Sequence, residues 1–192
     1  IPLRLVGSEM CIRDSANFGA SAVTLDTATS KQWLHLNFTA GMSVSGVQSL
    51  LGTVFQGWSI ASRDDAQNLI VDAGLPLADM TLTADAALDA AIVSAAGFLG
   101  NTMSVDGPYT GFAGMNSTTD GFGYNYLFAW TSNGVYQYLS TGASGGYLSP
   151  SFTEADLGVF LERSSVPAPG ALALLGFGLL AVAGVRRKTS RP

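Results

Sequence analysis

The stretch GYNYLFAWTSNGVYQYLS, residues 123–140, decides the fold class of this chain. Its first half places an aromatic side chain at every second position: Tyr124, Tyr126, Phe128 and Trp130. A period of two is typical of a strand with one apolar face. Asn133 and Gly134 then suit a tight turn with positive φ, after which Tyr136 and Tyr138 alternate on a return strand. The stretch therefore predicts an antiparallel hairpin with its aromatic residues on one face.

This aromatic face has two interpretations. The rings can pack in the core as a cross-strand ladder. Alternatively, flat rings can stack on sugar faces while tyrosine hydroxyls supply hydrogen bonds, which makes the hairpin a carbohydrate-binding platform. The candidate ligand-binding residues are Tyr124, Tyr126, Trp130 and Tyr136.

The segments before the hairpin predict further strands and two main helices. Residues 20–36 read as two short strands around a polar turn, because apolar residues alternate with polar ones on either side of TATS. Ser62 precedes a helix over residues 63–73, with acidic residues in the first turn and Gly74 at its end. A second helix, capped by Thr83, carries an apolar stripe up to residue 99.

The remaining segments of the body complete the predicted fold. Residues 101–123 are rich in glycine and read as a long loop. Residues 156–165 read as one final strand, and residues 164–169 as a linker. We therefore expect one α+β domain within residues 16–163, with two main helices against an antiparallel sheet and with adjacent first and last strands.

Charge is distributed unevenly along the 192 residues. The chain is 47% hydrophobic and 12% charged, with a net charge of −5, but residues 16–165 hold twelve acidic and only three basic residues. Phosphate binding needs clustered lysine and arginine, which this body lacks. We therefore expect no nucleic acid as a partner.

Residues 1–15 resemble a sequencing artefact. Val6 to Ser15 follows the translation of the end of a common transposon-based sequencing adapter, residue for residue. The single cysteine, Cys11, lies within this segment, so we expect no disulfide framework or thiol nucleophile in the body. The segment also says nothing about a signal peptide, which would have preceded it.

The body offers few residues for catalysis or metal binding. His35 is the only histidine and lies among bulky apolar residues, which indicates a partly buried strand residue rather than a catalytic base. Asp106, Asn116 and Asp120 could supply oxygen ligands to Ca²⁺, but they lack the spacing of known calcium loops. We expect no metal, no cofactor and no enzymatic activity. The alternative is an extracellular hydrolase that brings Asp106 and Asp120 together in a cleft.

The C-terminal end predicts a membrane segment. Residues 170–185 are apolar on every side and, as a helix, reach roughly 24 Å, which is thin against a hydrocarbon core of about 30 Å. The basic residues of the tail, residues 186–192, place that tail in the cytoplasm and the acidic body outside. A buried core helix is the alternative, but it fits poorly with the charges that follow at once.

This end resembles the PEP-CTERM sorting signal, which exosortases recognise in Gram-negative bacteria that make exopolysaccharide. The resemblance rests on a Pro-x-Pro motif, a short apolar span and a basic cluster, in that order. It implies that the signal consists of Val166, Pro167, Ala168, Pro169, Arg186, Arg187 and Lys188. Ala168 stands where the family usually has glutamate. The resemblance implies a transient anchor in the inner membrane and exosortase as a partner.

The body is similar to a group of PEP-CTERM proteins through three segments. They are DTATSKQWLHL at residues 26–36, GWSIASRDD at residues 57–65, and VFLER at residues 159–163. Ser30 stands where glycine is usual in that group. The same pattern resembles bacterial adhesin domains of C-type-lectin-like fold, which implies that first and last strands pair. Together these resemblances imply an exported protein of the cell surface or exopolysaccharide matrix.

Overall fold

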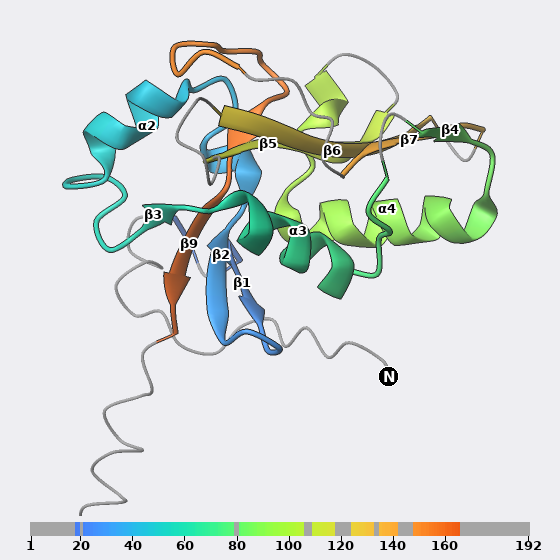
Figure 1. Ribbon diagram of the computed structural model, residues 1–192, viewed down its shortest axis with the longest axis horizontal. Coiled ribbons are helices and arrows are strands. Elements are labelled where there is room, and N and C mark those ends of the chain that lie inside the picture. The colour runs from blue at the N-terminus through green and yellow to red at the C-terminus, as the bar shows by residue number, and fades with distance from the viewer. Residues whose placement is uncertain are drawn as a thin grey trace, which may run out of the picture.

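The computed structural model describes residues 18–19, 21–78, 81–105, 109–117, 124–132, 135–141 and 148–165. Within these ranges the chain forms two β-sheets and three α-helices, which confirms the α+β class. Figure 1 shows α3 and α4 on one side of β5, β6 and β7, and the orange segment that leads to β9 on the other side. Strands β1, β2 and β9 cross the long strands at a steep angle.

The larger sheet is built around the predicted hairpin. Its strands are β4 (Thr81–Thr83), β7 (Gln137–Ser140), β6 (Tyr124–Ser132), β5 (Tyr109–Ser117) and β8 (Gly158–Val159), in this spatial order. β6 and β7 pair antiparallel, with Trp130 opposite Tyr138, so the hairpin is confirmed. Tyr136 precedes β7 rather than belonging to it, and the Asn133-Gly134 turn lies outside the described residues. β5 and β8 run parallel, in contrast to the expected purely antiparallel sheet.

The prediction of a loop over residues 101–123 is wrong for residues 109–117, which form β5. The glycines that suggested a loop serve close packing instead. A Cβ atom at Gly111 would lie 2.2 Å from the Ala129 carbonyl oxygen, and one at Gly114 would lie 2.5 Å from the Phe160 ring. Glycine inside a strand marks such close approach, which composition alone cannot distinguish from a loop.

The helices α3 and α4 cover one face of the larger sheet. α3 (Arg63–Asp72) begins at the predicted cap, where the Ser62 hydroxyl accepts a hydrogen bond from the Asp65 amide, and Gly74 follows with a φ of 85°. α4 (Ala86–Leu99) packs on β5 and β6. The predicted cap Thr83 is wrong, because Thr83 pairs with Gln137 in the sheet and Asp85 caps α4.

Two short 3-10 helices and one more α-helix complete the helical part. α2 (Val44–Leu50) is capped by Ser43. The 3-10 helices are η1 (Leu36–Phe38) and η2 (Met103–Val105).

The smaller sheet joins the two ends of the domain. Its strands are β1 (Val23–Asp26), β2 (Lys31–Leu34), β9 (Leu161–Ser164) and β3 (Ser59–Ile60), in this order, and all pairs are antiparallel. The last strand therefore lies beside the N-terminal hairpin, with Leu34 opposite Leu161. The prediction that the first and last strands are adjacent is wrong, because β2 lies between β1 and β9.

The single final strand predicted over residues 156–165 is wrong, because it is divided between the sheets. Phe160 separates β8 from β9: its amide donates to the Met115 carbonyl of the larger sheet, and its carbonyl accepts from Ala61. Its buried ring meets Trp33 edge to face, with the ring centroids 6.3 Å apart. Phe160 thus lies where the two sheets meet.

In the part of the chain that the structure describes, no helix is long and apolar enough to cross a membrane. The predicted membrane helix at residues 170–185, the linker from Val166 onward and the basic tail lie outside the described residues. The C-type-lectin-like fold stays a prediction.

Candidate functional site

A pocket of about 310 Å³ opens on the face of the larger sheet that α3 and α4 do not cover. Its aromatic floor comes from β6 and β7, and its opposite wall from the segment before β8. The lining residues are Met103, Ala113, Tyr126, Phe128, Trp130, Tyr138, Leu148, Phe152, Glu154, Asp156 and Leu157. Among these described residues, none carries a positive charge.

The aromatic rings of the floor contact one another in sequence. The rings of Tyr126 and Phe128 stack with centroids 5.6 Å apart, and Tyr138 lies 5.2 Å from Phe128 and 5.8 Å from Trp130. Tyr109 extends the row, 4.9 Å from Trp130. Tyr126, Phe128 and Trp130 are partly exposed, whereas the alternate residues of β6 are buried. The row therefore leaves aromatic surface accessible on one face of β6, while the alternate residues pack in the core.

A small residue on β5 leaves space for the pocket. Ala113, which lines the pocket, lies opposite Phe128 in the sheet register. Directly opposed residues share a face of the sheet, so a large side chain at position 113 would fill the space above the rings. The register of β5 against β6 thus places a small side chain beside the aromatic row, in a segment where the sequence alone showed only many glycines.

The opposite wall of the pocket is the segment before β8. Leu148 forms backbone hydrogen bonds with Tyr124 in both directions, 2.8 and 3.4 Å long, and Gly41 donates to the Leu157 carbonyl. Between these anchors, Glu154 is exposed and Asp156 is half-buried. Within the described ranges, neither carboxylate forms a side-chain hydrogen bond or an ion pair.

Of the four predicted ligand-binding residues, the structure brings two to the pocket. Tyr126 and Trp130 line it. Tyr124 instead accepts a hydrogen bond from Gln48 Nε2 at 2.9 Å, and Tyr136 is 53% exposed outside the lining. Sequence reasoning missed Glu154 and Asp156, since no spacing signal links them to a strand some 25 residues earlier. A binding role for the four predicted residues stays a prediction.

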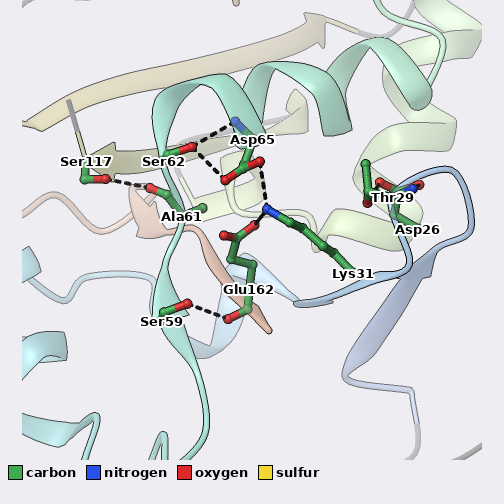
Figure 2. Close-up of polar contacts among 9 residues, drawn as sticks. All are labelled: Asp26, Thr29, Lys31, Ser59, Ala61, Ser62, Asp65, Ser117 and Glu162. Atoms are coloured by element: carbon green, nitrogen blue, oxygen red, sulfur yellow. Dashed lines mark hydrogen bonds and ion pairs between the residues drawn. The ribbon is translucent and has the colours of Figure 1, made fainter. Parts of the chain in front are cut away.

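A second polar cluster joins the two ends of the domain (Figure 2). Lys31 Nζ, on β2, lies 2.7 Å from Asp65 Oδ1 on α3 and 2.9 Å from Glu162 Oε2 on β9. We call these three residues the clasp. Their side chains are 26%, 31% and 13% exposed, in that order, so water screens the clasp only in part.

The clasp shifts the pKa of each member. For Lys31, burial lowers the pKa, but the hydrogen bonds to Asp65 and Glu162 outweigh it and the pKa is raised. For Asp65, burial raises the pKa, but the bonds from Lys31 and Ser62 outweigh it and the pKa is lowered. For Glu162, burial and the nearby charge of Asp65 raise the pKa despite Lys31. One cation shared between two carboxylates leaves the more buried one easier to protonate.

Neighbouring contacts hold the clasp in place. The Ser62 hydroxyl donates to Asp65 at 2.7 Å, and the Ser59 hydroxyl donates to the Glu162 carbonyl at 3.1 Å (Figure 2). Ser117 donates to the Ala61 carbonyl through both its amide and its hydroxyl, which ties the segment just before α3 to β5.

The three segments that resembled a group of surface proteins all meet at the smaller sheet. In the turn between β1 and β2, Asp26 accepts hydrogen bonds from Ala28 and Thr29. Arg163 of β9 lies 4.4 Å from the centroid of the Trp58 ring. Since these residues face one another or the core, the shared pattern has a sufficient structural explanation.

The described residues offer little for acid-base or metal chemistry. His35 directly follows β2, where its Nε2 atom lies 3.2 Å from the Thr24 hydroxyl and burial lowers its pKa. Within the described ranges, no three histidine, cysteine or carboxylate residues come close enough together to hold a metal ion. Asp106 and Asp120, the carboxylates of the hydrolase alternative, lie outside those ranges, while Asn116 is buried in β5.

Comparison with known protein families gives one match. Residues 165–188 match the family model of the PEP-CTERM protein-sorting motif. The chain carries a PEP-CTERM sorting motif. This motif is an exosortase-processed sorting signal, and it marks an exported protein that is anchored transiently in the membrane. It begins at the residue that follows the end of β9 at Ser164, so Glu162 of the clasp lies close to the signal in the chain. No curated protein sequence and no solved structure matches the chain.

Proposed function

We propose that the exported body binds a carbohydrate chain in the aromatic pocket, at the cell surface or in the exopolysaccharide matrix. The observation that carries this proposal is the row of partly exposed rings, Tyr126, Phe128, Tyr138 and Trp130, along an open hollow. Sugar rings present flat CH faces that pack on aromatic rings, and a row of rings suits a chain of several sugar units better than a single small molecule.

Polar groups of the opposite wall complete the recognition of sugar hydroxyls. Glu154 and Asp156 line the same pocket as the rings. Ionised carboxylates accept hydrogen bonds strongly, and hydroxyl groups donate them. An apolar floor with a few polar groups at the side is the usual composition of a small-ligand site.

The sorting motif supports this location for the function. It marks the body as exported, so polymers outside the cell are the ligands it meets. We propose that Val166, Pro167, Ala168 and Pro169 form the region that exosortase recognises, and that Arg186, Arg187 and Lys188 hold the tail at the cytoplasmic side of the inner membrane before processing.

We propose binding rather than catalysis as the function of the pocket. The alternative is hydrolysis of the bound chain, for which Glu154 and Asp156 would supply the two carboxylates that glycosidases use. Incubation of the protein with each bound glycan, followed by measurement of new reducing ends, separates the two. Release of new ends that is lost in Glu154→Gln would overturn the non-enzymatic proposal.

Binding can be tested on the full chain in a detergent without a sugar headgroup. We expect retention on a bacterial exopolysaccharide array, and a loss of at least tenfold in affinity for Trp130→Ala and Tyr126→Ala, because stacking rings contribute most of such contacts. Tyr136→Ala is the matched control, since Tyr136 is exposed but lies outside the pocket lining. Equal losses in all three variants, or no retention on any glycan, would contradict the proposal.

The sorting role has its own test in the producing bacterium. Deletion of the exosortase is expected to leave the chain unprocessed in the inner membrane, since the C-terminal signal is no longer removed. Pro169→Ala should give the same phenotype, whereas Ala168→Glu restores the usual family residue and should be processed at least as fast. Unchanged mass and location after deletion would contradict this assignment.

A further inference from the structure

We infer that the pocket prefers a glycan with positively charged amino sugars, and this inference rests on the proposed function. The pocket combines five aromatic residues with two carboxylates that have no partner among the described residues. A pocket can recognise a neutral sugar without any net charge in its lining. A lining that carries two negative charges and, within the described residues, no positive charge selects ligands by charge as well as by shape.

The basic residues of the body lie elsewhere. Lys31 is bound in the clasp, and Arg163 donates to Gln32 at 2.7 Å and lies over Trp58. Arg63 begins α3, on the opposite side of the larger sheet. Since none of the three lines the pocket, no described cation offsets the charge of Glu154 and Asp156 there.

Both parts of the lining attract an ammonium group. Tryptophan and tyrosine faces are electron-rich and attract cations within about 6 Å of the ring centroid. The adjacent carboxylates attract the same charge, whereas they repel the carboxylates of uronic acid polymers. The sugar ring that stacks on the floor can therefore direct its amino group toward the wall that holds Glu154 and Asp156.

Selectivity for charge is tested with three oligosaccharides of equal length: glucosamine, N-acetylglucosamine and galacturonic acid oligomers. Affinities are measured by calorimetry on the full chain at about pH 5.5, where ordinary Asp and Glu carboxylates are ionised. We expect the glucosamine oligomer to bind roughly fivefold or more tightly than its acetylated form, and the galacturonic acid oligomer to bind most weakly. High salt should reduce this ratio.

Two isosteric substitutions test whether Glu154 and Asp156 cause the preference for the glucosamine oligomer. In Glu154→Gln and Asp156→Asn together, the preference for the glucosamine oligomer should fall to about twofold or less, while binding of the acetylated oligomer is kept. Asp64→Asn is the control for net charge, because Asp64 is exposed on α3 and lies outside the pocket lining. It should keep the full preference.

The outcomes separate this inference from the proposed function. Equal affinity for the acetylated and free amino sugars, or an equal loss of preference in Asp64→Asn, overturns the charge preference but leaves carbohydrate binding intact. Tightest binding of the galacturonic acid oligomer also overturns it. If none of the three oligomers binds and the array shows no other ligand, the proposed function fails, and this inference fails with it.

Discussion

The clasp and the aromatic pocket use acidic residues in opposite ways. In the clasp, Asp65 and Glu162 both lie within 3 Å of Lys31, and they connect β2, α3 and β9. In the pocket, Glu154 and Asp156 have no such partner among the described residues and line an open hollow. A carboxylate that is paired with a cation contributes to stability, whereas an unpaired one at a hollow is available to a ligand. The comparison therefore separates the structural end of the molecule from its candidate binding face.

The largest expected difference between the structural end and the candidate binding face comes from truncation of their large aromatic residues. Phe160→Ala removes a fully buried ring where the sheets meet, and we expect a loss of about 3–5 kcal/mol in the free energy of unfolding. Trp130→Ala removes a half-buried ring of the pocket and should cost about 1–2 kcal/mol, while it weakens glycan binding by at least tenfold. Denaturant titration measures both. A larger loss for Trp130→Ala would show that the pocket row, rather than the sheet junction, holds the fold.

The next largest effect on stability is expected from removal of the cation that Asp65 and Glu162 share. Lys31→Met leaves Asp65 and Glu162 close together without their common partner, and we expect a loss of about 1–3 kcal/mol. The lower part of this range reflects the partial exposure of the clasp. Glu154→Gln, the matched change in the pocket, should alter stability by less than about 0.5 kcal/mol. If Lys31→Met and Glu154→Gln changed the free energy of unfolding equally in denaturant titration, the distinction between paired and unpaired carboxylates would be wrong.

The contribution of the clasp to stability is also expected to depend on pH. Because the pKa of Asp65 is lowered below its ordinary value of 3.8, its contribution to stability is present above that pH and is lost as the pH falls through the lower native value. We expect Asp65→Asn to be less stable than the native chain at neutral pH by about 1 kcal/mol or less, and the difference to shrink as the pH falls below the ordinary pKa of 3.8.

Melting temperatures from about pH 7 to pH 2 check this expectation. Glu162 changes the stability in the opposite direction. Because its pKa is raised in the folded chain, protonation of Glu162 favours the folded state as the pH falls. Removal of the Asp65 charge also removes one of the causes that raise the pKa of Glu162, so the difference between the two proteins reports on the coupled pair of carboxylates. Asp64→Asn, an exposed neighbour on α3, is the control. A difference between the native chain and Asp65→Asn that persists unchanged to acidic pH would exclude an ionic contribution from the clasp.

The smallest expected effect concerns the turn beside the clasp. Ser30 has a φ of 57°, in the left-handed region that glycine adopts without strain. Ser30→Gly should therefore stabilise the chain by about 0.5 kcal/mol. Ser49→Gly, inside α2, should have the opposite sign, because glycine weakens a helix. Calorimetric melting of the two variants checks the difference in sign, and a loss of stability in Ser30→Gly would contradict the strain argument.

Local chemistry allowed the sequence to predict several elements correctly. The alternation of aromatic residues predicted β6, the Ser62 cap and Gly74 predicted the bounds of α3, and the TATS turn predicted β1 and β2. Each of these signals lies within a few residues of the element it specifies. The sorting motif was also readable from sequence, because its apolar span and charges are local features.

Contacts between distant segments explain what the sequence could not predict. Gly111 and Gly114 indicated a loop because the crowding by Ala129 and Phe160 that requires glycine comes from other strands. Thr83 could not be excluded as a cap before Gln137 was known to pair with it. Likewise, the placement of Glu154 and Asp156 beside Trp130 depends on how the segment before β8 crosses the sheet.

By itself, the sequence determined the α+β class, the hairpin, the cap of α3 and the exported destination, since periodicity, capping and a terminal signal act over short distances. Only the tertiary structure decided that the last strand divides between two sheets at Phe160, that Lys31 pairs with two carboxylates, and that the aromatic row borders a hollow. The physical reason is that sheet register and side-chain packing join residues far apart in the chain, and their close approach leaves no pattern in either segment alone.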